Sequence, residues 1–380
     1  EGFNIDYIGP VDGHNIKDLI NVFEAAKKKD GPIVIHVVTK KGKGYKPAEE
    51  DKNGKWHGVG KFDVKTGEML SSIPENYKTY SQIVADKVLK IMDKDDRVTA
   101  ITPAMISGSC MNNMFAKYPK RCFDVGIAED HAITFACGMA LEGLRPFVSV
   151  YSSFLQRAYD QLNHDVCRMN LPVVIGVDRC SIIGEDGDSH QGVFDISYMN
   201  SLPNMVIAEG KNSSQIEALL DLAFSQTSPF AIRYPRGSIE YNCDCKCDVA
   251  LGKWEFVVNN IDSKVSIITY GNDVCKIEKD INDNHLPYNL INALFIKPID
   301  EELLVSVARL NKPIVVYTND IIKGGLGDSI LECLNKNHIN APVYILGVDD
   351  IYVKHGSVLK VKESLGLDLN SLYHFIESIC

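Results

Sequence analysis

The sequence has no apolar run of about 18 residues, the length that a helix needs to cross a membrane. It also has no excess of positive charge, because 50 acidic side chains outnumber 40 basic ones and give a net charge of −10. This balance disfavours broad binding to nucleic acid or to anionic membranes. We therefore expect a soluble globular protein without nucleic-acid or membrane partners, in which a local cluster of basic side chains binds any anionic ligand.

Paired C-x-x-C spacing, typical of structural zinc sites, is absent among the 11 cysteines. Most cysteines lie singly in apolar stretches, as Cys167 and Cys333 do, which favours a reduced, cytoplasmic protein over a disulfide framework. The exception is the C-x-C-x-C run of Cys243, Cys245 and Cys247. This run could hold a soft metal, but it falls in a predicted linker, and we expect no metal ligands in the chain.

An initiating Met and a charged-then-apolar leader are also missing, and Glu1 opens into a segment typical of a domain interior. We therefore expect a truncated N-terminus. The length of 380 residues predicts about two to three domains.

The first part of the chain predicts one helix and one strand. Asn15 is a suitable N-cap, and four apolar residues follow at helical spacing: Ile16, Leu19, Ile20 and Phe23. The β-branched run 33–38 is typical of a buried parallel strand, so we expect the last helix–strand unit of a sheet whose earlier strands are missing. Residues 40–75 lack periodicity and predict a long loop.

Strands and helices alternate in the rest of the chain. The expected strands of a first block are 98–101, 147–150, 173–177, 205–208 and 230–233, with helices from Glu129, up to Met169 and over 216–224. A second block begins near Val265, with further strands expected at 294–296, 314–317 and 343–346. The pattern predicts an α/β protein with two consecutive open, mostly parallel sheets and helices on both faces. We expect the parts to span residues 1–75, 76–240 and 250–380.

Ligands of an open parallel sheet bind at the carboxyl ends of its strands. The segments that follow the expected strands of the first block are 129, 151–157, 178–190 and 233–237. Together they supply a carboxylate, aromatic rings, three or four arginines and a histidine. This combination predicts a pocket for a phosphorylated, partly aromatic ligand system.

The same segments resemble the 1-deoxy-D-xylulose-5-phosphate synthases. The matching strings, in the order of that family, are YIGPVDGH (7–14), TKKGKGYKPAE (39–49), IAEDHAITFACG (127–138), YSSFLQRAYDQ (151–161), DRCSIIGEDGDSHQGVFDISY (178–198) and RYPRG (233–237). Transketolases and pyruvate dehydrogenase β-subunits share the domain plan, but LQRAYDQ favours the synthases.

The resemblance implies a transferase of the transketolase type, which uses thiamine diphosphate and Mg²⁺. Such an enzyme condenses pyruvate with glyceraldehyde 3-phosphate to 1-deoxyxylulose 5-phosphate and CO₂, for isoprenoid biosynthesis, and forms a homodimer. It also implies that residues 1–75 are the end of a diphosphate-binding domain with a linker. Residues 76–240 would be the pyrimidine-binding domain and residues 250–380 the transketolase C-terminal domain.

Roles in the cofactor site follow from the same resemblance. Glu129 matches the carboxyl group that hydrogen-bonds the aminopyrimidine ring and promotes loss of the thiazolium proton. Phe154 matches the ring that stacks on the pyrimidine, and Tyr151 and Arg157 resemble residues lining the cofactor and acceptor pocket. Taken alone, Glu129 reads as an ordinary acid at a helix start, and the aromatic residues read as core.

Roles in the acceptor site are implied as well. Arg179 and Arg236 resemble the ligands of the acceptor phosphate, which a guanidinium binds through two charge-assisted hydrogen bonds. Asp186 and His190 match a polar pair near the reacting carbonyls, and His57 resembles a linker histidine that reaches the active site. As isolated residues, the arginines would form surface salt bridges and His57 would be an exposed loop residue.

The sequence departs from the family in two respects. Asp130 stands where the family usually has Gln, and the G-D-G string with a following Asn, which binds Mg²⁺ and the diphosphate, is absent. We therefore expect the diphosphate ligands to lie in a missing N-terminal part, and the chain alone to bind thiamine diphosphate weakly and to be inactive. Two alternatives remain: the C-terminal subunit of a split transketolase-like enzyme, and a non-catalytic binding module that retains the fold.

Overall fold

The computed structural model describes residues 3–51, 56–70, 73–241 and 247–380. The chain divides into two compact units, residues 1–72 and 73–380, and each is described by itself. Cys243 and Cys245 of the C-x-C-x-C run lie outside the described residues. Among the helices of the described parts, none is long and apolar enough to cross a bilayer.

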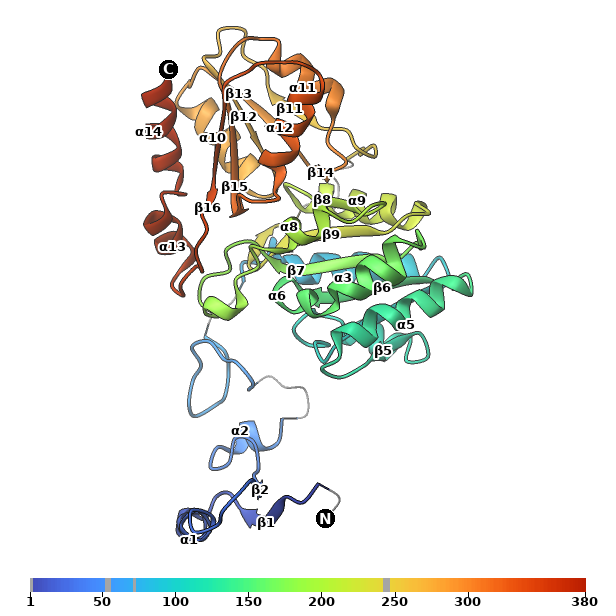
Figure 1. The fold of residues 1–380 in the computed structure, drawn as a ribbon, viewed down its shortest axis with the longest axis vertical. Helices are drawn as coiled ribbons and strands as arrows, with labels where there is room; N and C mark the ends of the chain where they lie inside the picture. The colour runs from blue at the N-terminus through green and yellow to red at the C-terminus, as the bar shows by residue number, and fades with distance from the viewer. Residues whose placement is uncertain (1–2, 52–55, 71–72, 242–246) are drawn as a thin grey trace. The chain divides into compact units, whose positions relative to one another are not determined.

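The first unit contains a parallel pair of strands, β1 (Asp6–Asp12) and β2 (Ile33–Val38), joined by α1 (Ile16–Ala26) (Figure 1). The predicted helix and its cap are confirmed, because the Asn15 side chain accepts a hydrogen bond from the Asp18 backbone N–H at 3.3 Å. The prediction that the strand 33–38 is buried is wrong, since none of its residues is buried. One neighbouring strand and one helix are too little structure to cover both faces of this pair.

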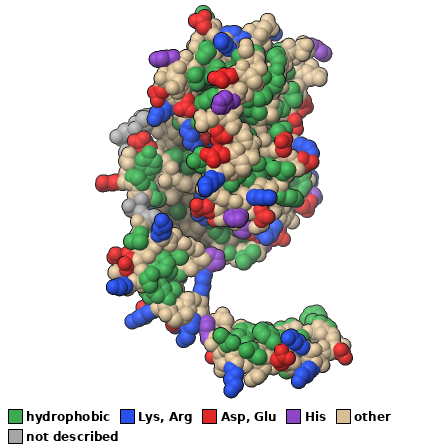
Figure 2. All heavy atoms as spheres, turned by 90° about the vertical axis from the view of Figure 1, so that its left-hand side faces the viewer, with side chains coloured by type: hydrophobic (Ala, Val, Ile, Leu, Met, Phe, Trp, Pro, Cys, Tyr) green, Lys and Arg blue, Asp and Glu red, His purple; other side chains and the backbone are tan. Residues whose placement is uncertain are grey.

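Apolar side chains of this unit therefore remain at its surface, as the green atoms in Figure 2 illustrate. Exposed members are Phe3, Tyr7, Ile16, Ile20, Phe23, Val34 and Val38. The segment expected as a plain loop has some order of its own. It includes α2 (Lys46–Glu49), and the rings of Tyr45 and Phe62 pack edge-on or tilted around Trp56 and each other.

The second unit contains a seven-stranded sheet in the order β14-β8-β9-β7-β6-β4-β5. Its strands are β4 (Val98–Thr102), β5 (Cys122–Asp124), β6 (Arg145–Tyr151), β7 (Val174–Cys180), β8 (Val206–Glu209), β9 (Phe230–Pro235) and β14 (Phe295–Lys297). All neighbours are parallel except β14 and β8. The five residues of β4 are all buried, as expected for a parallel strand covered on both faces.

The helices of this sheet are α3 (Tyr80–Met92), α4 (Asn112–Lys117), α5 (Glu129–Leu141), α8 (Asp195–Asn200) and α9 (Ser213–Ser225). The single helix expected up to Met169 is instead a broken series. It consists of α6 (Ser152–Leu155), η1 (Gln156–Ala158), α7 (Tyr159–Gln161) and the π-helical turns of η2 (Leu162–Cys167). β3 (Tyr77–Thr79) and β10 (Ser238–Glu240) form a separate two-stranded antiparallel sheet.

A five-stranded sheet follows in the order β11-β13-β12-β15-β16. Its strands are β11 (Glu255–Val258), β12 (Val265–Thr269), β13 (Tyr288–Asn292), β15 (Ile314–Ile321) and β16 (Val343–Val348). Its helices are α10 (Asp273–Asp283), α11 (Glu301–Ala308), α12 (Leu326–Lys336), α13 (Val358–Leu365) and α14 (Leu369–Ile379). Only β11 runs antiparallel to its neighbour, so the predicted α/β class with two mostly parallel sheets is confirmed.

The strand at 294–296 was expected in the second sheet, and this prediction is wrong because the strand belongs to the first sheet. The second sheet uses β13, and the chain then crosses to the first sheet, where Phe295 of β14 pairs with Ala208 of β8. This crossing pairs the open edge of β8, which would otherwise present unpaired backbone groups. The Trp254 indole N–H donates to the Phe295 carbonyl at 2.7 Å and holds the crossing segment.

Candidate active site

The order of strands defines a crevice in the seven-stranded sheet. β4 and β6 are neighbours, but the chain leaves β4 toward β5 on one side and leaves β6 toward β7 on the other. Such a reversal of strand order opens a crevice at the carboxyl ends, where ligands of open α/β sheets bind. Glu129 begins α5 after β5, and Tyr151 ends β6, so the topology brings these two segments to this crevice.

Glu129 is the buried carboxylate of this region, with 4% of its surface exposed. Its Oε1 lies 3.4 Å from Nη1 of Arg157, whose side chain is 57% exposed. The Arg157 guanidinium also lies 5.4 Å from the centre of the Phe154 ring. Arg157 thus connects the carboxylate that follows β5 with the ring that follows β6.

Phe154 lies at the centre of an aromatic group. Its ring stacks on Tyr151 with centroids 5.4 Å apart and an interplanar angle of 26°, and it meets the edge of His190 at 5.5 Å. Nδ1 of His190 is 3.0 Å from Oγ of Ser189. Tyr151 is itself buried, which raises the pKa of its hydroxyl above the ordinary value.

The basic part of the site begins on the other side of Tyr151. The Arg179 guanidinium lies 4.2 Å from the centre of the Tyr151 ring and donates a hydrogen bond to Asp186. Nη1 of Arg236 donates to the other oxygen of Asp186 at 2.8 Å. Two guanidinium groups therefore flank one carboxylate, and guanidinium groups are suited to bind a phosphate through charge-assisted hydrogen bonds.

Eight of the nine predicted site residues therefore form one connected set of contacts. The set comprises Glu129, Tyr151, Phe154, Arg157, Arg179, Asp186, His190 and, through Asp186, also Arg236. His57 is the ninth predicted residue. The roles given to these residues remain predictions.

His57 belongs to the first unit, where it is exposed and its Nδ1 is 2.8 Å from Nζ of Lys41. Its approach to the active site therefore stays a prediction.

The sequence analysis missed Asp178, an acid inside the apolar run of β7. It is fully buried, and its Oδ2 accepts a hydrogen bond from Ser81 Oγ at 2.8 Å. Burial raises the pKa of Asp178 to about 7, although the Ser81 hydrogen bond and the Arg179 charge oppose this shift. An acid within an otherwise apolar strand was a signal that could have identified this buried polar group.

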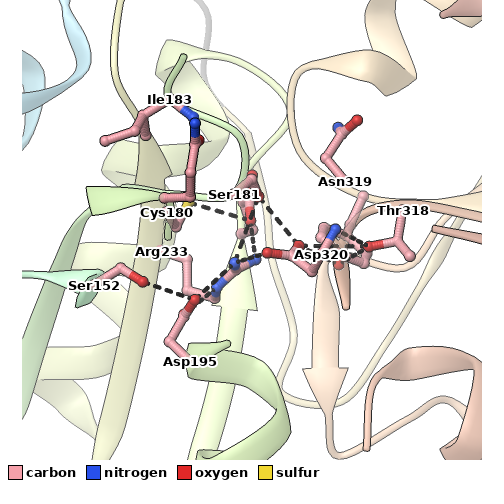
Figure 3. A network of polar contacts seen from close by, with 12 residues as sticks. Ser152, Cys180, Ser181, Ile183, Asp195, Arg233, Thr318, Asn319 and Asp320 are labelled. Atoms are coloured by element: carbon pink, nitrogen blue, oxygen red, sulfur yellow. Dashed lines mark hydrogen bonds and ion pairs between the residues drawn. The ribbon is translucent and has the colours of Figure 1, made fainter. Parts of the chain in front are cut away.

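Arg233 was expected among the arginines of the pocket, and the structure corrects this expectation. Its side chain is 0% exposed and is surrounded by carboxylates (Figure 3). Nε donates to Asp195 at 2.6 Å, Nη1 to Glu209 at 2.5 Å and Nη2 to Asp320 at 2.8 Å. Its hydrogen-bonding capacity is used within the protein, so Arg233 is not a ligand for substrate.

This buried network contains more carboxylates than guanidinium groups. Burial raises the pKa of Glu209 to about 7, while the charge of Arg233 opposes the shift. Burial also raises the pKa of Asp320, again against the attraction of Arg233. The residues come from β8, β9, α8 and β15, so the network joins the two sheets.

No group of three or more His, Cys, Asp or Glu side chains that could hold a metal ion occurs in the described ranges. The candidate cofactor contacts of the chain are the buried carboxylate of Glu129, the ring of Phe154, and Tyr151 and Arg157 beside that ring.

Three protein-family models match the chain. The transketolase pyrimidine-binding domain matches residues 76–241, and the transketolase C-terminal domain matches residues 252–372. A third model, described as 1-deoxy-D-xylulose-5-phosphate synthase, matches residues 1–39.

Curated relatives carry the name 1-deoxy-D-xylulose-5-phosphate synthase. The protein of Listeria welshimeri is 42% identical over 369 residues, which are 95% of this chain and 58% of that protein. The protein of Clostridium tetani is 45% identical over 371 residues, which are 97% of this chain and 59% of that protein. The chain thus spans about three fifths of the length of these relatives.

Solved structures share the fold. A chain described as a split-gene transketolase, inactive β4 tetramer, has a TM-score of 0.68 and 25% identity, with 79% of this chain and 97% of that chain covered. A transketolase of Pichia stipitis has a TM-score of 0.66 and 12% identity, with 80% and 46% covered, and shows the fold alone. Over the length that it spans, the chain belongs to the 1-deoxy-D-xylulose-5-phosphate synthase family of transketolase-like proteins.

Proposed function

We propose that the chain forms the pyrimidine-binding and C-terminal domains, residues 76–240 and 250–380, of a thiamine-diphosphate-dependent synthase. The complete enzyme condenses pyruvate with glyceraldehyde 3-phosphate to 1-deoxyxylulose 5-phosphate and CO₂. The observation that carries this proposal is the pair of guanidinium groups, Arg179 and Arg236, connected through Tyr151 and Phe154 to the buried Glu129. A phosphate site and a buried carboxylate in one crevice suit a phosphorylated acceptor.

The residues present fit the pyrimidine half of thiamine diphosphate. Glu129 offers a buried carboxylate at the start of α5 for a hydrogen bond to the pyrimidine. Phe154, connected to Glu129 through Arg157, offers a half-buried ring on which the pyrimidine can stack. When bound, the cofactor supplies a carbanion-type nucleophile for the donor substrate. We propose that the ligands of Mg²⁺ and of the diphosphate lie outside residues 1–380, in the two fifths of the relatives that the chain does not span.

In this proposal each site residue of the chain has its own role. Glu129 holds a proton at the pyrimidine ring, and Arg157 fixes the position of that carboxylate. Arg179 and Arg236, whose guanidinium groups both contact Asp186, bind the acceptor phosphate. Asp186 lies with His190 near the reacting carbonyls. His190, which lies against Phe154, is suited to exchange a proton with the reacting oxygen. For His57, a role in the mechanism rests on its resemblance to the linker histidine of the family alone.

A split arrangement is the second candidate. The solved structure described as a split-gene transketolase is a separate chain, and this chain covers 97% of it. That description supports a version in which another polypeptide supplies the diphosphate half. In both versions we propose a cytoplasmic enzyme that forms a dimer and has complete active sites.

Complementation tests the proposal directly. The chain is mixed with, or fused to, a diphosphate-binding domain of a relative such as the Clostridium tetani protein, and product formation from pyruvate and glyceraldehyde 3-phosphate is measured. We expect activity that depends on both parts and on Mg²⁺ and thiamine diphosphate. Activity with a different acceptor and none with glyceraldehyde 3-phosphate would contradict the proposed substrate.

A further inference from the structure

The two arginines of the candidate phosphate site lie close in sequence to the buried network. Arg179 precedes Ser181 by two residues, and Arg236 follows Arg233 by three. Ser181 Oγ and Arg233 Nη2 are 3.5 Å apart. The side chains that fix these two backbone segments are therefore in contact with each other, below the site itself.

Asp320 is a carboxylate that binds both segments. Its Oδ1 accepts from Arg233 Nη2 at 2.8 Å, and its Oδ2 accepts from Ser181 Oγ at 3.1 Å (Figure 3). The Tyr270 hydroxyl donates to Oδ2 at 2.7 Å and orients the group. Asp320 is 1% exposed and comes from β15, in the five-stranded sheet. A residue of the second sheet thus holds two strand ends of the first.

The backbone around Ser181 has a conformation that needs such support. Arg179 has φ 55° and Ser181 has φ 62°, in the left-handed region that residues other than glycine rarely adopt. Such backbone conformations are stable only where several surrounding contacts hold them. The Asp320–Ser181 hydrogen bond is a contact of that kind, because it holds the side chain of the second strained residue.

Ser181 also lies at the base of the loop that carries Asp186 and His190. Ser181 and Gly192 exchange backbone hydrogen bonds at 2.6 and 2.9 Å, which close the base of this loop. Next to Asp320, the Ile321 backbone N–H donates to the Val193 carbonyl at 3.0 Å. The end of β15 therefore supports both ends of the loop.

Stability alone is a poor explanation for this network. A buried ion cluster is weak evidence for a gain in stability, since desolvation offsets the attraction between its charges. Here the carboxylates of Asp195, Glu209 and Asp320 share a single guanidinium, Arg233, so the balance of charge is unfavourable as well. The directed contacts of Asp320 account for the arrangement better.

We propose that Asp320 is a positioning residue of the acceptor site, which holds Arg179, Arg236 and the loop of Asp186 in place through Ser181 and Arg233. This proposal rests on the proposed function of Arg179 and Arg236 as phosphate ligands.

The test compares Asp320→Asn with a matched control, Asp273→Asn. Asp273 is equally buried, at 1% exposure, but it lies at the start of α10, where its ion pairs are with Lys276 and Lys362. Binding of inorganic phosphate to the full chain is followed through the arginine side-chain NMR signals, with Arg236→Ala as a reference. We expect Asp320→Asn to weaken phosphate binding about tenfold, roughly one charge-assisted hydrogen bond, and Asp273→Asn to leave it unchanged.

The outcomes distinguish the positioning role of Asp320 from the phosphate site itself. Equal weakening of phosphate binding in Asp320→Asn and Asp273→Asn would show that Asp320 contributes only to general stability. Unchanged binding in Asp320→Asn, together with loss of binding in Arg236→Ala, would overturn the positioning role alone. Absence of saturable binding in the parent chain, or unchanged binding in Arg236→Ala, would overturn the phosphate site and this proposal with it. If Asp320→Asn does not fold, Ser181→Ala removes the same contact and decides by the same criteria.

A second readout separates positioning from folding in the complemented enzyme. We expect Asp320→Asn to raise KM for glyceraldehyde 3-phosphate and to leave KM for pyruvate unchanged. An equal rise in both constants, or a fall in kcat alone, would contradict the proposal.

Discussion

Nη1 of Arg157 lies 3.4 Å from Oε1 of Glu129, so an exposed guanidinium holds a carboxylate that is almost fully buried. The contact joins the helix that starts after β5 to the broken helix that follows β6. It fixes one oxygen of Glu129 and leaves the rest of the carboxyl group available for a ligand.

Glu129→Gln should abolish turnover in the complemented enzyme and leave the fold intact. The amide keeps the size of the side chain but cannot exchange a proton with the pyrimidine ring. Decarboxylation of pyruvate and the circular-dichroism spectrum are measured together. Asp130→Asn is the control, because Asp130 is the exposed neighbour on the same helix turn. Turnover at the parent rate in Glu129→Gln would remove Glu129 from the mechanism.

Arg179→Ala and Arg236→Ala should each weaken the acceptor and leave pyruvate unaffected. A lost hydrogen bond to a charged group is worth about 1.5 to 3 kcal/mol, which corresponds to a rise in the acceptor KM of about ten- to a hundredfold. Steady-state kinetics with both substrates varied provides the measurement. Arg168→Ala is the control, since this exposed arginine donates to the His164 carbonyl outside the site. An unchanged acceptor KM in both variants places the phosphate elsewhere.

Stability should fall as the pH rises from about 4.5 to 7, because of Glu209. Its pKa is raised by burial from 4.5 to about 7, so in this range the folded chain keeps a proton that the unfolded chain has released. At 1.4 kcal/mol per pH unit, the loss is on the order of 3 kcal/mol and levels off above pH 7. Asp178, with a pKa raised to about 7, adds a loss of the same sign.

Urea unfolding at pH 5 and pH 7 measures this effect. Glu209→Gln should show a smaller difference between the two pH values than the parent chain, because the amide does not titrate. Glu142→Gln, at the exposed end of α5, should retain the full difference. Equal differences in Glu209→Gln and the parent would show that another group dominates.

The sequence predicted what depends on local pattern. The strand ends that carry Glu129, Tyr151 and Arg179 follow from alternating elements, and the family motifs supplied the residues. It could not tell which arginine of RYPRG points inward, because Arg233 and Arg236 differ only in contacts with distant segments. Asp320 lies 87 residues from Arg233, and no local pattern reports such a pairing.

The run 288–297 shows the same limit within a sheet. Only residues 294–296 were expected as a strand, in the second block, but the run forms β13 and β14, which enter different sheets. The partner of each strand depends on which edge is open, which is a property of the whole fold. Likewise, the apolar pattern of 33–38 predicts a strand correctly but not how much of it is covered.

The chain by itself should bind thiamine diphosphate weakly. Glu129 and Phe154 offer one hydrogen bond and one aromatic contact, on the order of 1 kcal/mol each. These contributions cannot offset the loss of translational and rotational freedom, which costs about 4 kcal/mol or more. Calorimetric titration of the chain with Mg²⁺ and thiamine diphosphate, repeated after addition of the complementing domain, measures the difference. We expect saturable binding only in the second titration, and loss of that binding in Phe154→Ala. A micromolar dissociation constant in the first titration would place a diphosphate site within residues 1–380.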